Sequence, residues 1–572
     1  MQRVIRTLGL VAMVSLLVVA LGVTSAQDMM DNVLQTEIGP SDVPTLDPAL
    51  ATDSSSIQIL NETYIGLTML DDETASTEPG LAESWELTDN GDGTSTWTFT
   101  LREGIPWVKY NAESGEVEEV LDADGNVRYV NAFDLAYGWE RTLSPVTAGD
   151  YAYVLVPEVL GGTEYNGQEV GEDGSLAVDS SVLGFEAVDE YTFAVTTDAP
   201  KETQPTIYGM WMARPQPQWA IEEAGELWIE PENFVSYGPF ALWEWNHDEF
   251  ISIIKNPFWP GTDNNPQPAL DGVVFNMLDS VTALAEYEAG NLDDVDDVDS
   301  ASIPRIQADP TLSEELVIED GSCSYYYGFG TGVAPMDNVN LRRAFSFAVD
   351  RQQIVDEVTQ GGQTPATYFT LPSLAAAPQP EAMDDLGYGI GYDPDAAIEE
   401  LDIALEDMGL SSVDELPPIT LLYNTSEGHR RIAEAIRDQW SDLLGIEVQL
   451  TNQDFGVYLD QRPEFPVWRA GWCFDYPDTN NFLFDVFHST SANNDTGWAS
   501  PAFDALVEEA IAETDADVRA ELYAEAEQIL VYEDAAIIPI YWYSDLELTK
   551  PYVERTYAVD NSEQYENWSL NR

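Results

Sequence analysis

The order of apolar and polar positions along the chain predicts short strands that alternate with amphipathic helices. Residues 419–423 and 446–450 are predicted strands, and the segment 429–444 between them predicts a helix that a following glycine ends. This β–α–β succession is typical of a parallel sheet. Residues 96–101 alternate in polarity after a turn at 90–93, which predicts a hairpin with one buried face.

Strand-and-helix units recur over the rest of the chain. A strand at 273–275 precedes a helix over 280–289, and a long helical region runs from 500 to 529 with one interruption near Thr514. Such repetition favours α/β lobes over a β sandwich. We expect the proline-rich segment 200–217 to form the crossing between the lobes.

Composition adds a strong negative charge to this picture. The chain has 572 residues, 44% of them hydrophobic, so we expect a globular protein of two or three domains. Its formal net charge of −82 repels phosphate backbones and argues against nucleic acid as a partner. One explanation is an acidic coat that keeps a secreted protein soluble in salty water, and the other is an acidic surface for a cationic ligand. The spread of carboxylates along the whole chain favours the coat.

The first 26 residues predict an export signal. Arg3 and Arg6 precede an apolar stretch over 8–23, and small residues at 24–26 form a cleavage site. No later segment approaches the roughly 18 consecutive apolar residues of a membrane span. We expect a soluble periplasmic or extracellular protein without a lipid-attachment cysteine.

The stretch 468–478 carries the most varied chemistry in the chain. We expect it to border a ligand cleft in which Asp475 takes a positive group and Arg469 a negative one. Two alternatives stay open: Asp475 as a plain turn residue before Tyr476, and Arg469 as the ion-pair partner of Asp475. Likewise, His429 is either a ligand contact or a solvent-facing residue, and Trp472 is either a cleft wall or core.

The chain has only two cysteines, Cys323 and Cys473. Outside the cytoplasm two cysteines more often pair than stay free. Their bond would close a loop of about 150 residues, which contributes roughly 4–5 kcal/mol in the chain-entropy model. Two buried free thiols are the alternative.

Catalytic motifs are missing from the sequence. The three histidines do not form an HExxH motif, no serine lies in a Gly-x-Ser-x-Gly setting, and no Gly-Lys-Ser/Thr phosphate loop exists. Acidic pairs abound, so residue types alone leave a glycosidase open. The segment 122–126 lacks the ligand spacing of a calcium loop. We expect no enzyme activity, no metal and no cofactor, and the absence of repeats argues against a surface-layer protein.

A series of short segments stands in a recognisable order along the chain. These segments are 80–86, 98–104, 238–240, 255–257, 323–327, 341–350, 421–426, 445–449, 469–473 with Asp475 and Tyr476, and 500–504. Together they resemble the substrate-binding proteins of ABC importers, in the class that takes peptides, over nearly all of the chain after the export signal. Within that class the sequence is most similar to the periplasmic oligopeptide-binding proteins.

The resemblance implies an α/β, periplasmic-binding-protein-like fold. Two lobes and an additional domain would give three domains, with mixed sheets flanked by helices. The implied boundaries are a signal peptide over 1–26, domain I over 27–64, 217–322 and 543–572, the additional domain II over 65–216, and domain III over 323–542.

The resemblance also implies a function and a set of site residues. The lobes would close on a short extended peptide, and the monomer would deliver it to ABC permease subunits that are served by separate ATPase subunits. The implied site comprises Asp475 for the peptide's α-ammonium; Arg462, Arg469 and His429 for carboxyl ends; Gly471 and Cys473 for the peptide backbone; and the cleft aromatics Tyr151, Phe455, Trp472 and Tyr543. Both cysteines fall where that family has a disulfide.

Departures from the family pattern leave an alternative open. The chain is slightly shorter between Arg462 and Arg469, and Phe455 stands where the family typically has Trp. The acidic segment 111–130 predicts a peripheral insertion. The alternative is the same fold with a nickel complex, a haem, a sugar or an opine as ligand. Asp475 separates the two, because a ligand without a free amine gives that carboxylate nothing to pair with.

Overall fold

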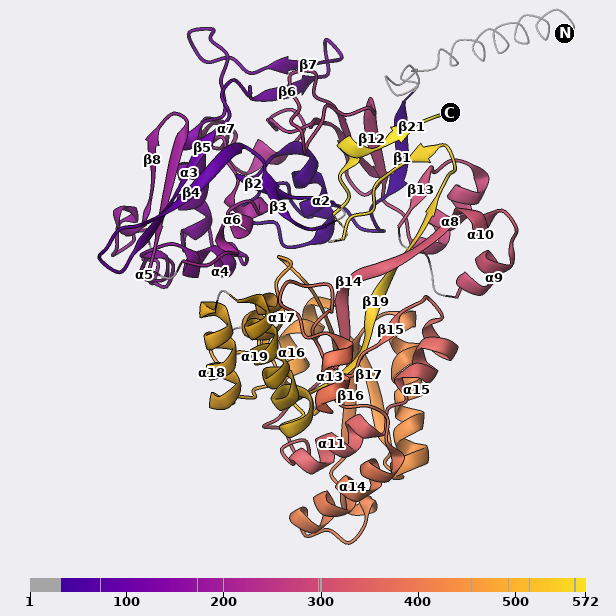
Figure 1. Cartoon of the computed structure of the whole chain (residues 1–572). Helices are drawn as coiled ribbons and strands as arrows, with labels where there is room; N and C mark the ends of the chain where they lie inside the picture. Colours follow the sequence, from indigo (N-terminus) through magenta and orange to yellow (C-terminus); the bar gives the residue numbers. More distant parts are fainter. Residues whose placement is uncertain are drawn as a thin grey trace, which may run out of the picture.

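The computed structural model describes residues 32–572, except 73, 172, 199, 297, 299–300, 454, 492, 514 and 560–561, and the side chains at 455 and 456. The predicted export signal therefore lies outside the described residues. The chain forms two lobes that are joined by two long strands (Figure 1).

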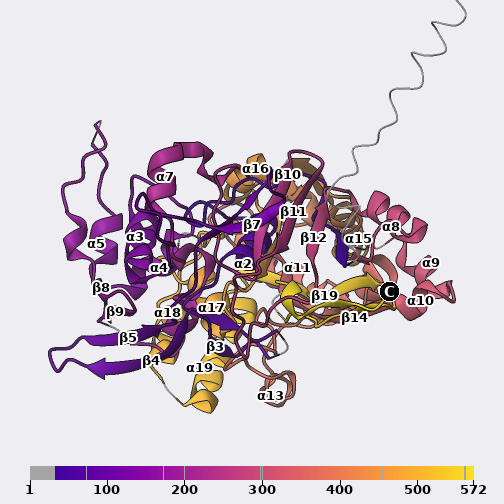
Figure 2. The ribbon, with the colours of Figure 1, turned by 90° about the horizontal axis from the view of Figure 1, so that it is seen from above.

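The first lobe contains two four-stranded sheets around a shared core. One sheet has the order β1 (Val33–Glu37), β12 (Gly272–Asn276), β11 (Phe250–Lys255), β10 (Phe240–Asn246), and the other has the order β4 (Ala82–Asp89), β5 (Ser95–Leu101), β9 (Thr192–Thr197), β8 (Phe185–Asp189). The predicted hairpin at 96–101 is β4 and β5, which pair antiparallel. Seen from above, this hairpin projects at one end of the molecule, opposite α8 and its neighbours (Figure 2).

Smaller elements complete the first lobe and its junction with the second. The helices are α2 (Ser54–Thr63), α3 (Ala132–Leu143), α4 (Ala152–Leu155), α5 (Gly162–Asn166), α6 (Gln204–Ile207), α7 (Gln218–Ala224), α8 (Ser280–Ala289), α9 (Ile303–Ala308) and α10 (Leu312–Glu315). The short strands are β2 (Thr68–Leu70), β3 (Thr77–Pro79), β6 (Val108–Asn111), β7 (Glu116–Glu119), β13 (Asp294–Val295), β20 (Val553–Glu554) and β21 (Ser569–Leu570).

The second lobe is built on one sheet with a core on each face. Its strands are β13, β19 (Ile537–Thr549), β14 (Leu316–Phe329), β18 (Val467–Cys473), β16 (Ile419–Asn424) and β17 (Val448–Gln453) in that order, with β15 (Thr364–Pro365) beside β19. The core on one face includes residues of α17 (Thr479–Phe487), α18 (Pro501–Ala512) and α19 (Ala516–Gln528). The core on the other face includes residues of α11 (Val339–Phe347), α14 (Pro394–Met408) and α15 (Glu427–Leu444).

The predicted β–α–β unit is present in this lobe. Strands β16 and β17 pair in parallel, and α15 connects them. The Ser426 side chain caps the start of α15, and Gly445 ends it at a φ of 68°, a conformation that favours glycine. The helix buries Ile432, Ile436 and Trp440 at helical spacing against the sheet.

Strands β14 and β19 cross between the lobes (Figure 1). They pair antiparallel along most of their length, so two hydrogen-bonded strands form the connection. The expectation that 200–217 forms the crossing was wrong, because that segment packs inside the first lobe, where Tyr208 and Met212 are fully buried. The predicted domain boundaries at 323 and 543 fall inside β14 and β19.

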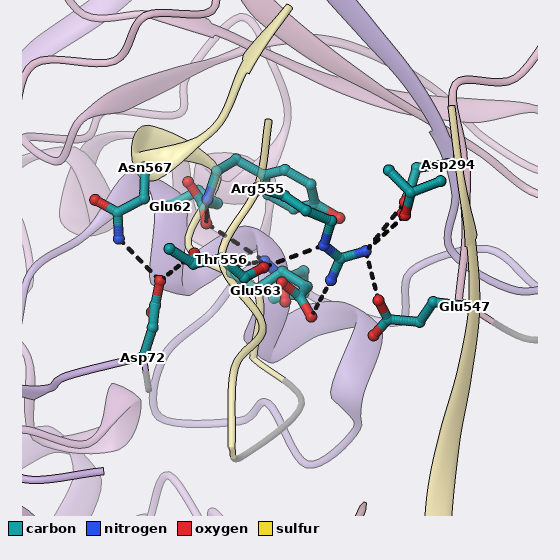
Figure 3. A network of polar contacts seen from close by, with 11 residues as sticks. Glu62, Asp72, Asp294, Glu547, Arg555, Thr556, Glu563 and Asn567 are labelled. Atoms are coloured by element: carbon teal, nitrogen blue, oxygen red, sulfur yellow. Dashed lines mark hydrogen bonds and ion pairs between the residues drawn. The ribbon is translucent and has the colours of Figure 1, made fainter. Parts of the chain in front are cut away.

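A buried ion-pair cluster anchors the first-lobe end of the crossing (Figure 3). Arg555 is 2% exposed and contacts Asp294 at 3.0 Å, Glu547 at 2.6 Å and Glu563 at 2.8 Å. Its guanidinium also lies 4.1 Å from the centre of the Trp568 ring. Since Glu547 belongs to β19 and Asp294 to β13, the C-terminal segment fixes the crossing strand to the first lobe.

Candidate ligand-binding site

A disulfide fixes the end of strand β18. Cys323 and Cys473 lie directly opposite each other in the register of β14 and β18, and they are bonded. The predicted pairing is confirmed. The chain leaves β18 just after this bond, so the bond sets where Phe474 and Asp475 begin their path toward the first lobe.

A cavity of about 380 Å³ lies between the lobes. Residues 471–475 line it from the second lobe, while α2, Tyr151 and Trp211 line it from the first. The C-terminal segment contributes Gln564 and Glu566. The predicted site residues that line this cavity are Tyr151, Gly471, Trp472, Cys473 and Asp475.

The Asp475 carboxylate is held by three neutral donors. It accepts hydrogen bonds from Tyr151 Oη at 3.2 Å, Tyr153 Oη at 3.1 Å and Asn481 Nδ2 at 3.1 Å. An ionised carboxylate offers about four lone-pair sites, so one site remains for a further donor. No cation pairs with Asp475 among the described residues.

Burial raises the pKa of Asp475, and the hydrogen bonds from Asn481, Tyr153 and Tyr151 oppose that rise. Asp475 lies at a bend in the chain, but its carboxylate does not cap α17, because Asp478 does. Asp475 instead points across to tyrosines of the other lobe. Its neighbour Tyr476 is 3% exposed and packs with the first-lobe core.

Arg469 lies in a pocket of tyrosines without a carboxylate partner among the described residues. Its guanidinium is 4.7 Å from the centre of the Tyr325 ring, Nη2 donates to Tyr543 Oη at 2.7 Å, and Nη1 donates to Asn424 Oδ1 at 3.3 Å. Burial lowers the pKa of Arg469, but the neighbouring tyrosines Tyr543 and Tyr325 outweigh it and raise the pKa above its usual range. The alternative of an Arg469–Asp475 ion pair was wrong.

Gly471 connects Arg469 to the cavity. Arg469 does not line the cavity itself, but a Cβ placed on Gly471 would stand 3.2 Å from Arg469 Nη2 and 3.6 Å from Tyr543 Oη. Glycine therefore leaves the guanidinium room beside the cavity wall. This arrangement brings Tyr543 and Arg469 next to the predicted backbone-binding position.

Two predicted cations are placed differently from the expectation. Arg462 is ion-paired with Asp495, lies 5.2 Å from the Trp468 ring centre, and does not line the cavity. His429 Nδ1 lies 3.4 Å from Tyr325 Oη, and burial together with the Arg469 charge lowers its pKa to about 3. His429 is therefore neutral near pH 7 and offers a hydrogen bond rather than a charge. The side chain of Phe455 lies outside the described residues.

Sequence reasoning missed Tyr153 and Asn481. Tyr153 follows Tyr151 by two residues in α4, and Asn481 is buried in the first turn of α17. Asn481 also accepts hydrogen bonds from Trp472 Nε1 at 3.1 Å and from the Asp475 backbone N–H at 3.0 Å. The sequence offered one signal for Asn481, the adjacent pair Asn480 and Asn481 after a capping aspartate. Amides that a helix buries need hydrogen-bond partners, so the pair indicates a polar network.

The described residues contain neither a membrane-spanning helix nor a metal-binding cluster. No helix in this part of the chain is both long and apolar enough to span a membrane. No group of three or more His, Cys, Asp or Glu side chains in these ranges is arranged to hold a metal ion.

Two α/β lobes with a cavity between them are the architecture of a solute-binding protein. The chain belongs to the bacterial extracellular solute-binding proteins, family 5, whose family model for the middle region matches residues 76–494.

Curated relatives and solved structures resemble the chain over most of its length. The oligopeptide-binding protein OppA of Bacillus subtilis is 32% identical over 88% of this chain and 86% of its own. The probable deoxycholate-binding periplasmic protein YgiS of Escherichia coli is 31% identical over 90% of this chain and 88% of its own. The crystal structure of Haemophilus influenzae OppA in complex with RPPGFSPFR is 28% identical, with a TM-score of 0.74 and coverage of 95% of this chain and 100% of that one.

Proposed function

We propose that this protein captures short peptides outside the cytoplasm and delivers them to the permease of an ABC importer. The observation that carries the proposal is the Asp475 carboxylate, which borders the interlobe cavity and has three neutral donors but no cation among the described residues. A buried carboxylate without a cation is costly, and the α-ammonium of a peptide would relieve that cost.

The far end of a peptide needs a complementary group. Arg469 supplies a cation that no described carboxylate neutralises, and it lies beside the cavity-lining Gly471. Its planar fork suits a carboxylate. Asp475 and Arg469 come from one strand and its extension, so β18 presents groups for both charged ends of a short ligand. The sheet-like backbone near Gly471 suits the peptide's own amides.

Family membership alone does not select peptides. One relative is named an oligopeptide-binding protein, and another is named a probable deoxycholate-binding protein. Asp475 favours the peptide, because a bile acid, a sugar or a haem offers no ammonium to this carboxylate. A nickel complex or an opine that lacks a free amine is disfavoured too, because it offers no ammonium to Asp475.

Location and partners follow from the same proposal. The segment 1–26 would direct export and be removed, and the protein would act in the periplasm or outside the cell without a lipid anchor. Transmembrane permease subunits with separate ATPase subunits would receive the peptide. The protein would work as a monomer, without catalysis and without a cofactor.

Native mass spectrometry of the purified full-length protein tests the proposal. We expect the protein to carry a distribution of co-purified masses that fragment as short peptides. The Asp475→Asn variant, prepared in the same way, should lose them. A single non-peptide ligand in the wild type would overturn the proposal, and so would an undiminished peptide distribution in the variant.

A further inference from the structure

Asp485 places a second carboxyl group behind the Asp475 carboxylate. It follows Asn481 by four residues in α17, so both side chains lie on one face of the helix. The amide nitrogen of Asn481 donates to Asp475 Oδ2 and to Asp485 Oδ2, each at 3.1 Å. Asp475 lines the interlobe cavity and Asp485 does not. Asp485 therefore makes no direct contact with a ligand in this cavity.

The orientation of the Asn481 amide is fixed by its own oxygen. That oxygen accepts hydrogen bonds from Trp472 Nε1 at 3.1 Å and from the Asp475 backbone N–H at 3.0 Å. Both of these groups are donors only, so the amide oxygen must face them and the amide nitrogen must face the two carboxyl groups. Asn481 is fully buried, and a rotation of its amide would break all of these hydrogen bonds. The amide is thus a rigid link between Asp475 and Asp485.

Asp485 is held from its other side by Tyr476. Tyr476 Oη donates to Asp485 Oδ2 at 2.7 Å and accepts from Asn480 Nδ2 at 2.6 Å. Tyr476 is buried and packs with the first-lobe core. A continuous hydrogen-bonded chain therefore runs from a residue between the lobes, through Asp485 and Asn481, to the carboxylate that borders the cavity.

The charge of Asp485 depends on the charge of Asp475. Burial raises the pKa of Asp485 to about 7, while hydrogen bonds from Tyr476 and Asn481 lower it and repulsion from Asp475 raises it. A cation beside Asp475 would offset this repulsion and lower the pKa of Asp485. The proton of Asp485 then passes to solvent. Ionised Asp485 in turn makes stronger, charge-assisted hydrogen bonds with Asn481 and Tyr476.

The other ionisable groups around Asp485 come from three elements. Lys201 of the first lobe lowers the pKa of Asp485, but its ammonium is ion-paired with Glu158 at 2.6 Å. Tyr153 of α4 and Tyr523 of α19 also lie near it. Burial and neighbouring carboxylates raise the pKa of both tyrosines, so their hydroxyls stay neutral. Among the described residues no ion pair involves Asp485, so no fixed countercharge holds it ionised.

We propose that Asp485 positions Asp475 through the Asn481 amide and releases a proton to solvent when the peptide's α-ammonium binds. This inference rests on the proposed peptide-binding function and adds to it a dependence of affinity on pH. Because a proton leaves the protein on binding, affinity rises as pH rises through about 7. The rise is about tenfold for each unit by which the ammonium lowers the pKa of Asp485.

Calorimetry on the wild type tests the coupling without a mutation. The probe is tri-alanine at about pH 7, titrated in phosphate and in Tris, whose ionisation enthalpies differ. We expect a release of up to about 0.5 proton per peptide, because an acid with a pKa of about 7 is half protonated there. The peptide's own amine, with a pKa of about 8, takes up only about 0.1 proton when it binds as the ammonium. No net release from the wild type would overturn the inference.

Two variants separate the charge of Asp485 from its hydrogen bonds. Asp485→Asn keeps an acceptor for Asn481 and Tyr476 but cannot ionise. It should lose the proton release, bind tri-alanine as the wild type does at about pH 5.5, and bind about tenfold more weakly than the wild type at about pH 8.5. Asp485→Leu also removes the acceptor and should bind about tenfold more weakly than Asp485→Asn at both pH values.

Glu527→Gln is the matched control. Glu527 is a fully buried carboxyl group of the same lobe, and burial raises its pKa too. It accepts a hydrogen bond from the Thr370 backbone N–H at 2.7 Å and does not line the cavity. This variant should keep the proton release and the pH profile of the wild type. A loss of the release here would show that the proton does not come from Asp485.

The outcomes separate this inference from the proposed function. If tri-alanine binds the wild type but Asp485→Asn keeps its proton release and pH profile, the coupling is wrong and the peptide function stands. If Asp485→Leu binds as tightly as Asp485→Asn, the positioning role is wrong. If tri-alanine does not bind the wild type, the proposed function fails and this inference fails with it. Should a variant not fold, the wild-type release still decides, because it must vanish at about pH 5.5, where Asp485 keeps its proton.

Discussion

The Tyr153 hydroxyl in the first lobe donates a hydrogen bond of 3.1 Å to the Asp475 carboxylate in the second. Tyr151 donates to the other oxygen of the same carboxylate at 3.2 Å. The carboxylate therefore gains two of its three side-chain donors only when the lobes meet. Since an ammonium would bind the same group, lobe closure and ligand capture act on one residue.

Removing the Tyr153 hydroxyl should weaken ligand capture. A hydrogen bond to a charged group contributes about 1.5–3 kcal/mol, so Tyr153→Phe should bind tri-alanine about 10- to 100-fold more weakly. Calorimetric titration measures this directly. Tyr110→Phe removes a hydroxyl from β6, outside the cavity lining, and should bind as the wild type does. If Tyr153→Phe and the wild type bind tri-alanine with equal affinity, the Tyr153–Asp475 hydrogen bond does not contribute to ligand binding.

Arg469 should govern recognition of the ligand's carboxyl end. Arg469→Gln removes the cation, and loss of a buried charge partner costs about 2–5 kcal/mol of binding. We expect tri-alanine to lose affinity while tri-alaninamide, which has no terminal carboxylate, is unaffected. Arg462→Gln is the control, because Arg462 pairs with Asp495 and should affect stability rather than the acid-to-amide ratio. An unchanged ratio in Arg469→Gln would refute the role of this residue.

The disulfide should contribute strongly to stability. Cys323 and Cys473 are 150 residues apart, and the chain-entropy model gives about 4–5 kcal/mol for a loop of that size. The double variant Cys323→Ala/Cys473→Ala should lose a free energy of unfolding of that order in urea denaturation. Wild-type protein denatured with a reductant present is the matched comparison. If the free energy of unfolding falls by less than about 1 kcal/mol in both the double variant and the reduced wild type, the sheet alone fixes β18.

His429 should make the protein less stable in acid. Its folded-state pKa is lowered to about 3 by burial and by Arg469, so between about pH 6.5 and 3 the unfolded chain binds a proton that the folded chain does not. Stability then falls as pH falls through this window, by at most about 1.4 kcal/mol per pH unit. His429→Gln should remove that slope in urea denaturation across pH.

His247 is a control, because its effect on the pH dependence of stability has the opposite sign to that of His429. Burial lowers the pKa of His247, but hydrogen bonds to Asp42 and Glu230 and the charges of these two carboxylates together raise it above the usual value. Its stabilisation is present below about pH 6.5 and is lost as pH rises through the higher folded-state pKa. His247→Gln should therefore lose stability on the acidic side, where His429→Gln gains it. The same sign for both variants would contradict the assignment of either group.

Local patterns predicted the elements whose residues lie close in sequence. The β–α–β unit at 419–450 was predictable because apolar periodicity and the glycine at its helix end are local signals. The apolar pattern predicts strands at 324–329 and 537–543, which cover only part of the crossing strands β14 and β19. Residues 318–320 of β14 are exposed and two of them are acidic, so a strand that crosses between lobes lacks the apolar pattern of a strand in a core.

The site was predictable only in part, for a related reason. Asp475 and Cys473 stand out within one short stretch, so sequence and resemblance led to them. Tyr153 reaches Asp475 from 322 residues away in the chain, and Glu62 meets the C-terminal Tyr565 from 503 residues away. Such contacts depend on how the lobes meet, and no periodicity within one segment encodes them.

The proposed function depends above all on the binding of a peptide's α-ammonium by Asp475. The most direct measurement compares tri-alanine with N-acetyl-tri-alanine, which lacks the ammonium, in calorimetric titrations of the wild type and of Asp475→Asn. We predict that the wild type binds the free amine more tightly by about 2–5 kcal/mol and that the variant loses this preference. Equal binding of both peptides by the wild type, or a preference that survives in Asp475→Asn, would contradict it.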